Sequence, residues 1–185
     1  MSLPIQASRS QQGFTLIELT IVLVTIGVLS AIAIPSFLSY QKRAKTAEAM
    51  ANLPSLFRGA AAYYNKQVSV PDPANSRITQ VSHCITGDSV RLPATPGSQK
   101  QDGNFDSDRT FKALSFRLAD PVYFAYEVDG ANLCTAGPNI DAYTFFAYGD
   151  LDDDGTFSTF SFEAATNAEL DLVRAPGVNI TDQTE

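Results

Sequence analysis

Residues 19–41 of this chain carry no charged side chain and are mostly apolar. A helix of about 20 apolar residues is long enough to cross the hydrocarbon core of a bilayer. One acid, Glu18, stands at the start of this stretch. An ionised carboxylate in a membrane helix costs roughly 2.5–3.5 kcal/mol and usually has a partner. The segment therefore predicts a membrane-spanning helix with an acid that has a specific role; the alternative is a plain anchor whose acid reaches the membrane surface.

The rest of the chain has the composition of a globular domain. The 185 residues are 44% hydrophobic and 18% charged, which suits one soluble domain plus an anchor. From residue 54 onward, 18 acidic side chains stand against 9 basic ones. An acidic domain is repelled by phosphate backbones, so we expect no nucleic-acid binding by bulk electrostatics.

The residues before the apolar stretch do not form an ordinary signal peptide. Residues 1–12 are polar with Arg9 as the one charged side chain, and no small-residue cleavage site follows the apolar core. The secretory pathway alone would thus leave an uncleaved anchor. Lys42, Arg43 and Lys45 follow the anchor, and the positive-inside rule would keep that side in the cytoplasm. Charge alone thus argues against export of the domain.

The two cysteines argue for export. Cys84 and Cys134 both lie in the acidic domain. An anchored, exported domain in an oxidising compartment favours one disulfide over two buried free thiols. The bond would close a loop of about 50 residues and stabilise the fold by about 4 kcal/mol in the chain-entropy model.

The start of the chain resembles the type IV prepilin signature. The resemblance rests on the string GFTLIEL at residues 13–19 and AIAIP at residues 31–35, and it covers about residues 9–60. It implies that a prepilin peptidase cleaves between Gly13 and Phe14, and that the new Phe14 amine is N-methylated. Residues 1–13 would be a cytoplasmic leader that is removed.

The resemblance also implies a location and a set of partners. The precursor would sit in the inner membrane with its N-terminus in the cytoplasm and its globular domain in the periplasm. Inner-membrane pilus assembly machinery would then build a homopolymer, a helical filament outside a Gram-negative cell. Such pili serve surface adhesion, twitching motility or DNA uptake. In the filament, Glu18 would pair with the Phe14 amine of a neighbouring subunit and set the register.

The expected fold is the α+β type IV pilin fold. We assign residues 14–38 to a transmembrane and fibre-core helix, 39–66 to its amphipathic half, 67–110 to a loop-rich αβ region, and 111–185 to an antiparallel sheet and C-terminal tail. Gly27, Pro35 and Pro54 are expected to kink the helix, because glycine is a weak helix former and proline removes a hydrogen bond.

Periodicity gives more local expectations. One small, apolar helix face is expected to pack on the sheet. Its residues are Ala44, Ala47, Ala51, Phe57, Ala60, Ala61 and Tyr64. Alternating patterns predict about four strands. Their expected ranges are 111–118, 122–128, 143–148 and 156–162.

Asp150, Asp152 and Asp154, followed by Gly155, match the first half of an EF-hand calcium loop. The second half of the loop does not match the EF-hand pattern. The pattern needs a glutamate at position 161, but the glutamate stands at position 163, and strands rather than helices are expected on both sides of the loop. We therefore weigh a Ca²⁺ site against an acidic hairpin with an Asp-Gly turn.

The sequence predicts no enzyme and no required cofactor. His83 beside Cys84 is the one nucleophile–base adjacency, and neighbouring residues of an extended chain point apart, so a loop or surface histidine is favoured. Two related functions share the N-terminal motif, namely a type II secretion pseudopilin and a minor pilin. A non-polymerising, membrane-anchored periplasmic binding module is the alternative from another class.

Overall fold

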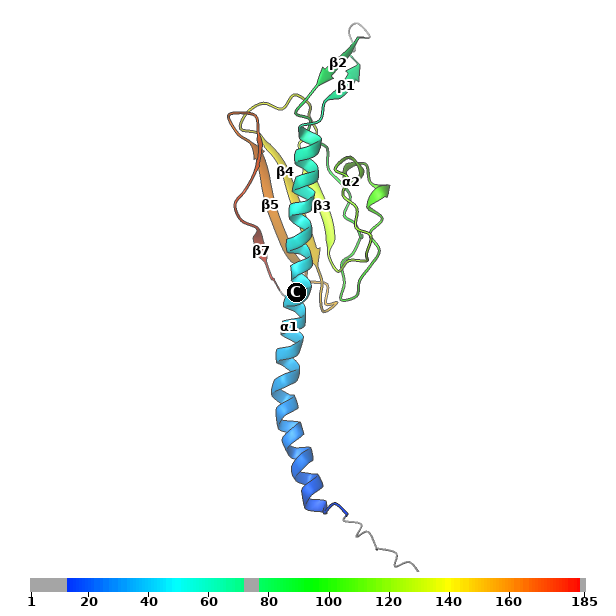
Figure 1. Ribbon diagram of the computed structural model, residues 1–185, viewed down its shortest axis with the longest axis vertical. Helices are drawn as coiled ribbons and strands as arrows, with labels where there is room; N and C mark the ends of the chain where they lie inside the picture. The colour runs from blue at the N-terminus through cyan, green and yellow to red at the C-terminus, as the bar shows by residue number, and fades with distance from the viewer. Residues whose placement is uncertain (1–12, 72–76, 184–185) are drawn as a thin grey trace, which may run out of the picture. The chain divides into compact units, whose positions relative to one another are not determined.

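The computed structural model describes residues 13–71 and 77–183 of the chain (Figure 1). The leader expected at residues 1–13 therefore lies outside the described residues except for Gly13. The chain divides into two compact units, one ending at Tyr40 and one beginning at Gln41. One long helix, α1 (Leu16–Tyr64), contributes residues to both.

The second unit is an antiparallel sheet with part of α1 packed on it (Figure 1). The sheet order is β3 (Ala125–Gly130), β4 (Asp141–Gly149), β5 (Ser158–Thr166) and β6 (Leu172–Arg174), and β7 (Asn179–Thr181) also pairs with β5. This confirms the α+β pilin-like layout. Three of the expected strands overlap β3, β4 and β5, whereas β6 and β7 were not expected.

Alternation in β4 and β5 builds the core of this sheet. Phe145 and Ala147 on β4 are buried opposite Phe162 and Phe160 on β5. Side chains of a strand alternate between its two faces, so the residues between them point to the other, partly exposed face. The two buried phenylalanines Phe145 and Phe162 lie with ring centroids 5.0 Å apart.

A single stripe of α1 covers this core. The buried helix residues follow one another at intervals of three or four, which places them on one face; they are Thr46, Ala49, Leu53, Leu56, Ala60 and Tyr64. The expected helix face is correct at Ala60 and Tyr64, which are buried, and wrong at Ala44, Ala47 and Ala51, which are exposed. Leucine removes far more apolar area from water than alanine does, so Leu53 and Leu56 set the rotation of the helix.

The strand expected at residues 111–118 is also wrong. A short helix, α2 (Arg109–Ala113), follows the 3₁₀ turn η1 (Phe105–Ser107). The Asp108 carboxylate accepts the backbone N–H groups of Thr110 and Phe111 at 2.8 and 3.0 Å, which starts the helix. Phe111 and Phe116 instead form a cluster with Phe105, whose ring centroid lies 5.1 Å from that of each.

The loop-rich region contains two strands that the sequence analysis missed. β1 (Val68–Pro71) and β2 (Ile78–Val81) form a separate antiparallel hairpin. The later part of the region runs along the outer edge of β3, where Leu92 and Tyr126 exchange backbone hydrogen bonds of 3.0 and 2.7 Å. This pairing covers an edge strand that would otherwise present free N–H and C=O groups.

Glu48 fastens the second half of α1 to the start of the sheet. Its Oε1 accepts the backbone N–H groups of Tyr123 and Phe124 at 2.9 and 3.2 Å. Desolvation raises the pKa of Glu48, although the two N–H donors act in the opposite direction. One turn later, Asn52 donates to the Tyr126 hydroxyl at 2.8 Å.

Candidate functional site

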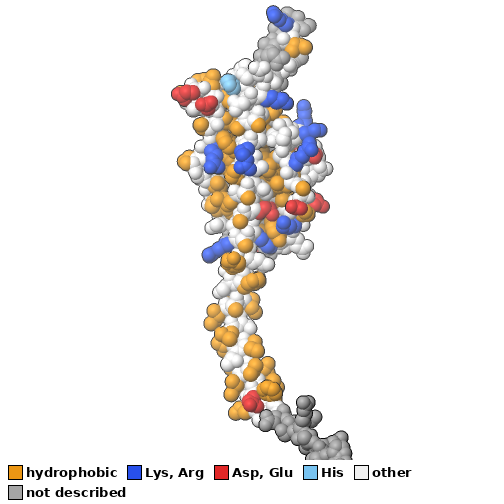
Figure 2. Space-filling view, viewed as in Figure 1, with side chains coloured by type: hydrophobic (Ala, Val, Ile, Leu, Met, Phe, Trp, Pro, Cys, Tyr) orange, Lys and Arg blue, Asp and Glu red, His pale blue; other side chains and the backbone are white. Residues whose placement is uncertain are grey.

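The first half of α1 is apolar and exposed. Phe14 is 88% and Leu16 81% exposed, and none of the most apolar window of the helix is buried. By length and composition this helix can cross a membrane. Figure 2 shows hydrophobic side chains along the visible face of this part, with an acidic side chain at its start. Within residues 13–71 and 77–183, no side chain of the most apolar window is buried.

The helix begins with a capping box made by Thr15 and Glu18. The Glu18 Oε2 atom accepts the Thr15 backbone N–H at 2.9 Å and the Thr15 hydroxyl at 2.7 Å. The Glu18 N–H donates to the Thr15 hydroxyl at 3.3 Å. This reciprocal pair satisfies N–H groups that the first helical turn leaves without partners. The sequence analysis missed Thr15, although a threonine three residues before a glutamate is the signature of this motif.

Gly13 has no role in the fold that requires a glycine. A Cβ atom added at this position would meet nothing within 4 Å, and Gly13 and Phe14 are both exposed. The same holds for Gly27, where an added Cβ would also meet nothing within 4 Å. Among the described residues, no steric contact requires a glycine at position 13 or at position 27.

Helix α1 continues through each position where a kink is expected. Gly27, Pro35 and Pro54 all lie within its helical residues. Pro35 has no N–H to donate, and the next residue, Ser36, donates its hydroxyl to the Ile32 carbonyl at 3.1 Å. Kinks at the three positions stay predictions.

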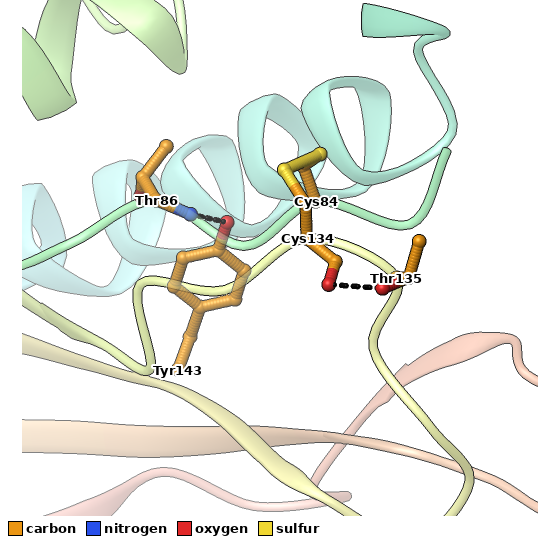
Figure 3. The surroundings of a disulfide bond; sticks show 5 residues. All are labelled: Cys84, Thr86, Cys134, Thr135 and Tyr143. Atoms are coloured by element: carbon orange, nitrogen blue, oxygen red, sulfur yellow. Dashed lines mark hydrogen bonds between the residues drawn. A yellow bond between two sulfur atoms is a disulfide. The ribbon is translucent and has the colours of Figure 1, made fainter. Parts of the chain in front are cut away.

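The expected disulfide between Cys84 and Cys134 is present (Figure 3). It joins residues 50 positions apart, which agrees with the loop length inferred from the sequence. Close by, the Thr86 N–H donates to the buried Tyr143 hydroxyl at 2.9 Å (Figure 3). The His83 ring stacks on the Tyr64 ring with centroids 4.9 Å apart, and the backbone N–H of His83 donates to the backbone carbonyl of Tyr64. Both contacts of His83 are packing and backbone contacts, which give this histidine a structural role.

The three aspartates after β4 come together. One carboxylate oxygen of each of Asp150, Asp152 and Asp154 lies within 4.8 Å of the others. The buried Asp150 accepts the N–H groups of Asp154 and Gly155, both at 3.1 Å. Asp152 pairs with Lys42 of α1 at 2.7 Å. The hairpin alternative explains these contacts, and the oxygens are also close enough to share one cation.

The loop that carries these aspartates is joined to its neighbours by further contacts. Asp153 accepts the Ser98 N–H at 2.8 Å and also the Ser98 hydroxyl, and these bonds lower the pKa of Asp153. Lys45 of α1 donates to the Ser98 carbonyl at 2.9 Å. Lys42 and Lys45, which the charge count of the sequence placed beside the membrane, thus bond α1 to two loops of the domain.

The residues for which processing and assembly roles are predicted lie in one short segment. Gly13, Phe14 and Glu18 lie within six consecutive positions at the start of α1. The disulfide and the aspartate loop belong to the second unit. The candidate functional site is therefore the exposed segment from Gly13 to Tyr40.

Comparison with known proteins finds the same segment. A family model described as the prokaryotic N-terminal methylation motif matches residues 8–34. No solved structure gives a significant match.

Three relatives show where the similarity lies. The type IV major pilin protein PilA of Myxococcus xanthus is 45% identical over 64 residues, 35% of this chain and 29% of PilA. The fimbrial protein EcpC of Eikenella corrodens is 39% identical over 77 residues, 42% of this chain and 49% of EcpC. A fimbrial protein of Pseudomonas aeruginosa is 34% identical over 93 residues, 50% of this chain and 60% of that protein. In each case the match spans less than two thirds of the relative.

Proposed function

We propose that this chain, which by its N-terminal motif and its relatives is a type IV pilin precursor, polymerises through residues 14–40 into an extracellular filament. One observation carries the proposal: this part of α1 is apolar and exposed, and no described part of the chain buries it. Apolar area of this size is unstable in water. A membrane before assembly and neighbouring helices after it would both remove that area from water.

Processing would convert the membrane form into the polymerising form. A prepilin peptidase would cleave after Gly13 on the cytoplasmic side, and methylation would follow at Phe14. Two features support this, namely the match to the methylation motif and the absence of any steric reason for a glycine at position 13. The domain from Gln41 onward would face the periplasm, where its disulfide is stable.

Glu18 would have one partner before assembly and another after it. In the single chain it caps its own helix through Thr15, and both contacts use the same oxygen, Oε2. In the filament it would pair with the Phe14 amine of a neighbouring subunit. A charge pair of this kind would set the register between neighbouring subunits. Any other register would leave a buried charge without its partner, which costs about 3–5 kcal/mol of stability.

Substitution of Glu18 by glutamine separates these two roles. Glutamine can complete a capping box but carries no charge. We expect Glu18→Gln and Glu18→Ala both to reduce the yield of sheared filaments strongly, while Thr15→Ala, which removes only the cap, retains most of it. The measurement is an immunoblot of the sheared fraction, with total cellular protein as the reference. Normal filament yield from Glu18→Gln would overturn the ion-pair role.

The filament would serve surface adhesion, twitching motility or DNA uptake. The rival functions make different predictions. A type II secretion pseudopilin would give short fibres and a loss of secretion on deletion, and a minor pilin would be a trace component of filaments built from another subunit. A non-polymerising binding module would give no sheared filaments and no mature chain that begins at Phe14. Quantitative mass spectrometry of the sheared fraction separates these cases.

Calcium binding by the aspartate loop is a second, separable proposal. The closeness of the three carboxylate oxygens supports it. If Ca²⁺ binds, millimolar Ca²⁺ should raise the melting temperature of the domain relative to Mg²⁺, and Asp154→Asn should remove the increase. An equal melting temperature in Ca²⁺, Mg²⁺ and chelator would leave only the hairpin role.

A further inference from the structure

The disulfide of the second unit joins two cysteines in very different surroundings. Cys84 is fully buried, with 0% of its surface exposed, whereas Cys134 is exposed and lies in the loop after β3. The proposed filament contact, at residues 14–40, does not involve this bond. Thiol–disulfide exchange depends on which of the two sulfur atoms an incoming thiolate can reach. The difference in burial therefore bears on how the bond opens and closes.

A surface hollow of about 620 Å³ lies on the Cys134 side of the disulfide. Of these two described cysteines, Cys134 lines the hollow and Cys84 does not. Sites that bind small molecules have volumes of roughly 300–1,000 Å³. The hollow is therefore large enough for a small thiol to approach the bond from the side of Cys134.

The residues on both sides of Cys84 are anchored in the core. The backbone N–H of His83 donates to the Tyr64 carbonyl at 2.9 Å, and the two rings stack. The Thr86 N–H donates to the Tyr143 hydroxyl at 2.9 Å (Figure 3). Tyr64 and Tyr143 are both buried. Exposure of the Cys84 sulfur would thus require this segment to leave two core side chains.

The neighbourhood of Cys134 is more open, but its loop is still held beside Cys84. Thr135 is exposed, and its hydroxyl donates to the Cys134 carbonyl (Figure 3). Backbone hydrogen bonds join the two segments; they are Ile85 N to Leu133 O at 2.7 Å, Asn132 N to Thr86 O at 3.0 Å, and Ala136 N to His83 O at 3.0 Å. None of these bonds contains a sulfur atom. The two sulfur atoms should therefore stay close together when the S–S bond is open.

We propose that thiol exchange in the folded domain takes place at Cys134, and that Cys84 is the resolving cysteine. An external thiolate attacks the Cys134 Sγ atom and forms an S–S bond with it. The bond between Cys84 and Cys134 breaks, and Cys84 leaves as a thiolate that takes up a proton. A second external thiol then attacks the external sulfur and releases Cys134. The two external thiols leave as one disulfide, and the chain gains two electrons and two protons.

The opposite order is chemically possible, but packing blocks it. Attack on Cys84 would release the exposed Cys134, whose thiolate is better solvated. The attacking thiolate must approach in line with the S–S bond, however, and on the Cys84 side no surface of that residue is exposed. Access therefore outweighs the quality of the leaving group.

The same order applies when the bond closes. An external disulfide would transfer one of its sulfur atoms to Cys134 and leave as a thiolate. The Cys84 thiolate, held nearby by the backbone hydrogen bonds, would then displace the external sulfur. The mixed disulfide would be short-lived, so exchange returns the chain to its internal bond. The inference goes beyond the filament role, because all its residues lie in one unit of one chain.

Two single-cysteine variants of the full mature chain, kept in detergent, test the order. Cys84→Ser leaves Cys134 as the thiol, and Cys134→Ser leaves Cys84. The probe is glutathione disulfide, and intact mass follows the mixed disulfide over time. We expect Cys134 to react about tenfold or more faster than Cys84 in the folded variants. In concentrated urea the two rates should agree within about twofold, because the difference arises from the fold.

Equal rates in the folded variants, or a faster reaction of Cys84, would overturn the proposal. Circular dichroism establishes that each variant is folded. If either variant fails to fold, the reduced wild-type chain decides the result through limited labelling with N-ethylmaleimide and peptide mapping. Labelling of Cys134 before Cys84 is then expected, and equal labelling would overturn the proposal. A chain that shows this order but never polymerises would keep this inference and overturn the proposed function.

Discussion

The two halves of α1 are both rich in apolar residues, but they use them differently. From Gln41 to Tyr64 the buried side chains form one stripe that covers the sheet. From Leu16 to Tyr40 the apolar side chains surround the helix and are exposed, as Leu23 is at 61% and Ile32 at 70%. The fold of one chain accounts for the buried stripe of the second half of α1. The exposed apolar surface of the first half is what the proposed function explains, through a membrane or other copies of the helix.

The difference can be expressed as free energy. Full burial of a leucine or isoleucine side chain contributes about 1.5–3 kcal/mol. In the second half this contribution goes to the stability of the domain. In the first half it becomes available only when lipid or neighbouring subunits cover the helix. Substitutions in the two halves should therefore change different measurements.

The largest expected effect on domain stability comes from the disulfide. Replacing both Cys84 and Cys134 by alanine releases a loop of 50 residues, and the free energy of unfolding should fall by about 4 kcal/mol. Urea unfolding of the mature chain in detergent, followed by far-UV circular dichroism, measures this. Processing at Gly13 should continue in the variant. A fall below about 1 kcal/mol would contradict the stabilising role of the bond.

A matched pair of leucine substitutions tests the comparison itself. Leu56 is fully buried against the sheet, so Leu56→Ala should lower the free energy of unfolding of the domain by about 2–5 kcal/mol. Leu23→Ala, in the exposed half, should leave domain unfolding unchanged and should reduce filament yield or filament stability instead. Equal losses of domain stability from the two variants would show that the halves are not distinct.

A smaller effect is expected at Glu48, which holds α1 to the sheet. Glu48→Ala removes the acceptor for two backbone N–H groups and should cost about 1–3 kcal/mol. Glu48→Gln keeps an acceptor oxygen and should cost less. Urea unfolding at pH 4 and pH 7 compares both variants with the wild type.

The pH dependence at Glu48 has a definite sign. Desolvation raises its folded pKa above the usual 4.5, so the folded state binds the proton more tightly than the unfolded state does. The contribution of this group to stability is thus present at low pH and declines as pH rises from about 4.5 through the folded pKa. Glu48→Gln should lack this decline. If the wild type gained stability relative to Glu48→Gln between pH 4 and pH 7, the assignment would be wrong.

The elements that carry a strong hydrophobic pattern could be predicted from the sequence. The apolar run predicted α1, and the alternation around Phe145 and Phe162 predicted β4 and β5. Two short elements, β6 and β7, were missed because three-residue strands carry little pattern. The rotation of α1 was also misjudged, since small alanines suggest close packing but Leu53 and Leu56 bury more area.

The residues of the candidate site stand close together in the sequence, and their processing and assembly roles stay predictions. Gly13, Phe14 and Glu18 are adjacent in sequence, so their grouping needs no tertiary contact. The disulfide needed only two cysteines and an exported domain. By contrast, α2 depends on the cap formed by Asp108, and the cover on the edge of β3 depends on the pairing of Leu92 with Tyr126, which lie far apart in the sequence.

The mass of the subunit in sheared filaments tests the central claim most directly. We predict a subunit of residues 14–185 with one added methyl group and an intact disulfide, so that its N-terminal residue is methylated Phe14. Fragmentation of the N-terminal peptide places the methyl group. Filaments whose subunits keep residues 1–13, or a mature chain that is found only in the membrane and never in the sheared fraction, would contradict the account.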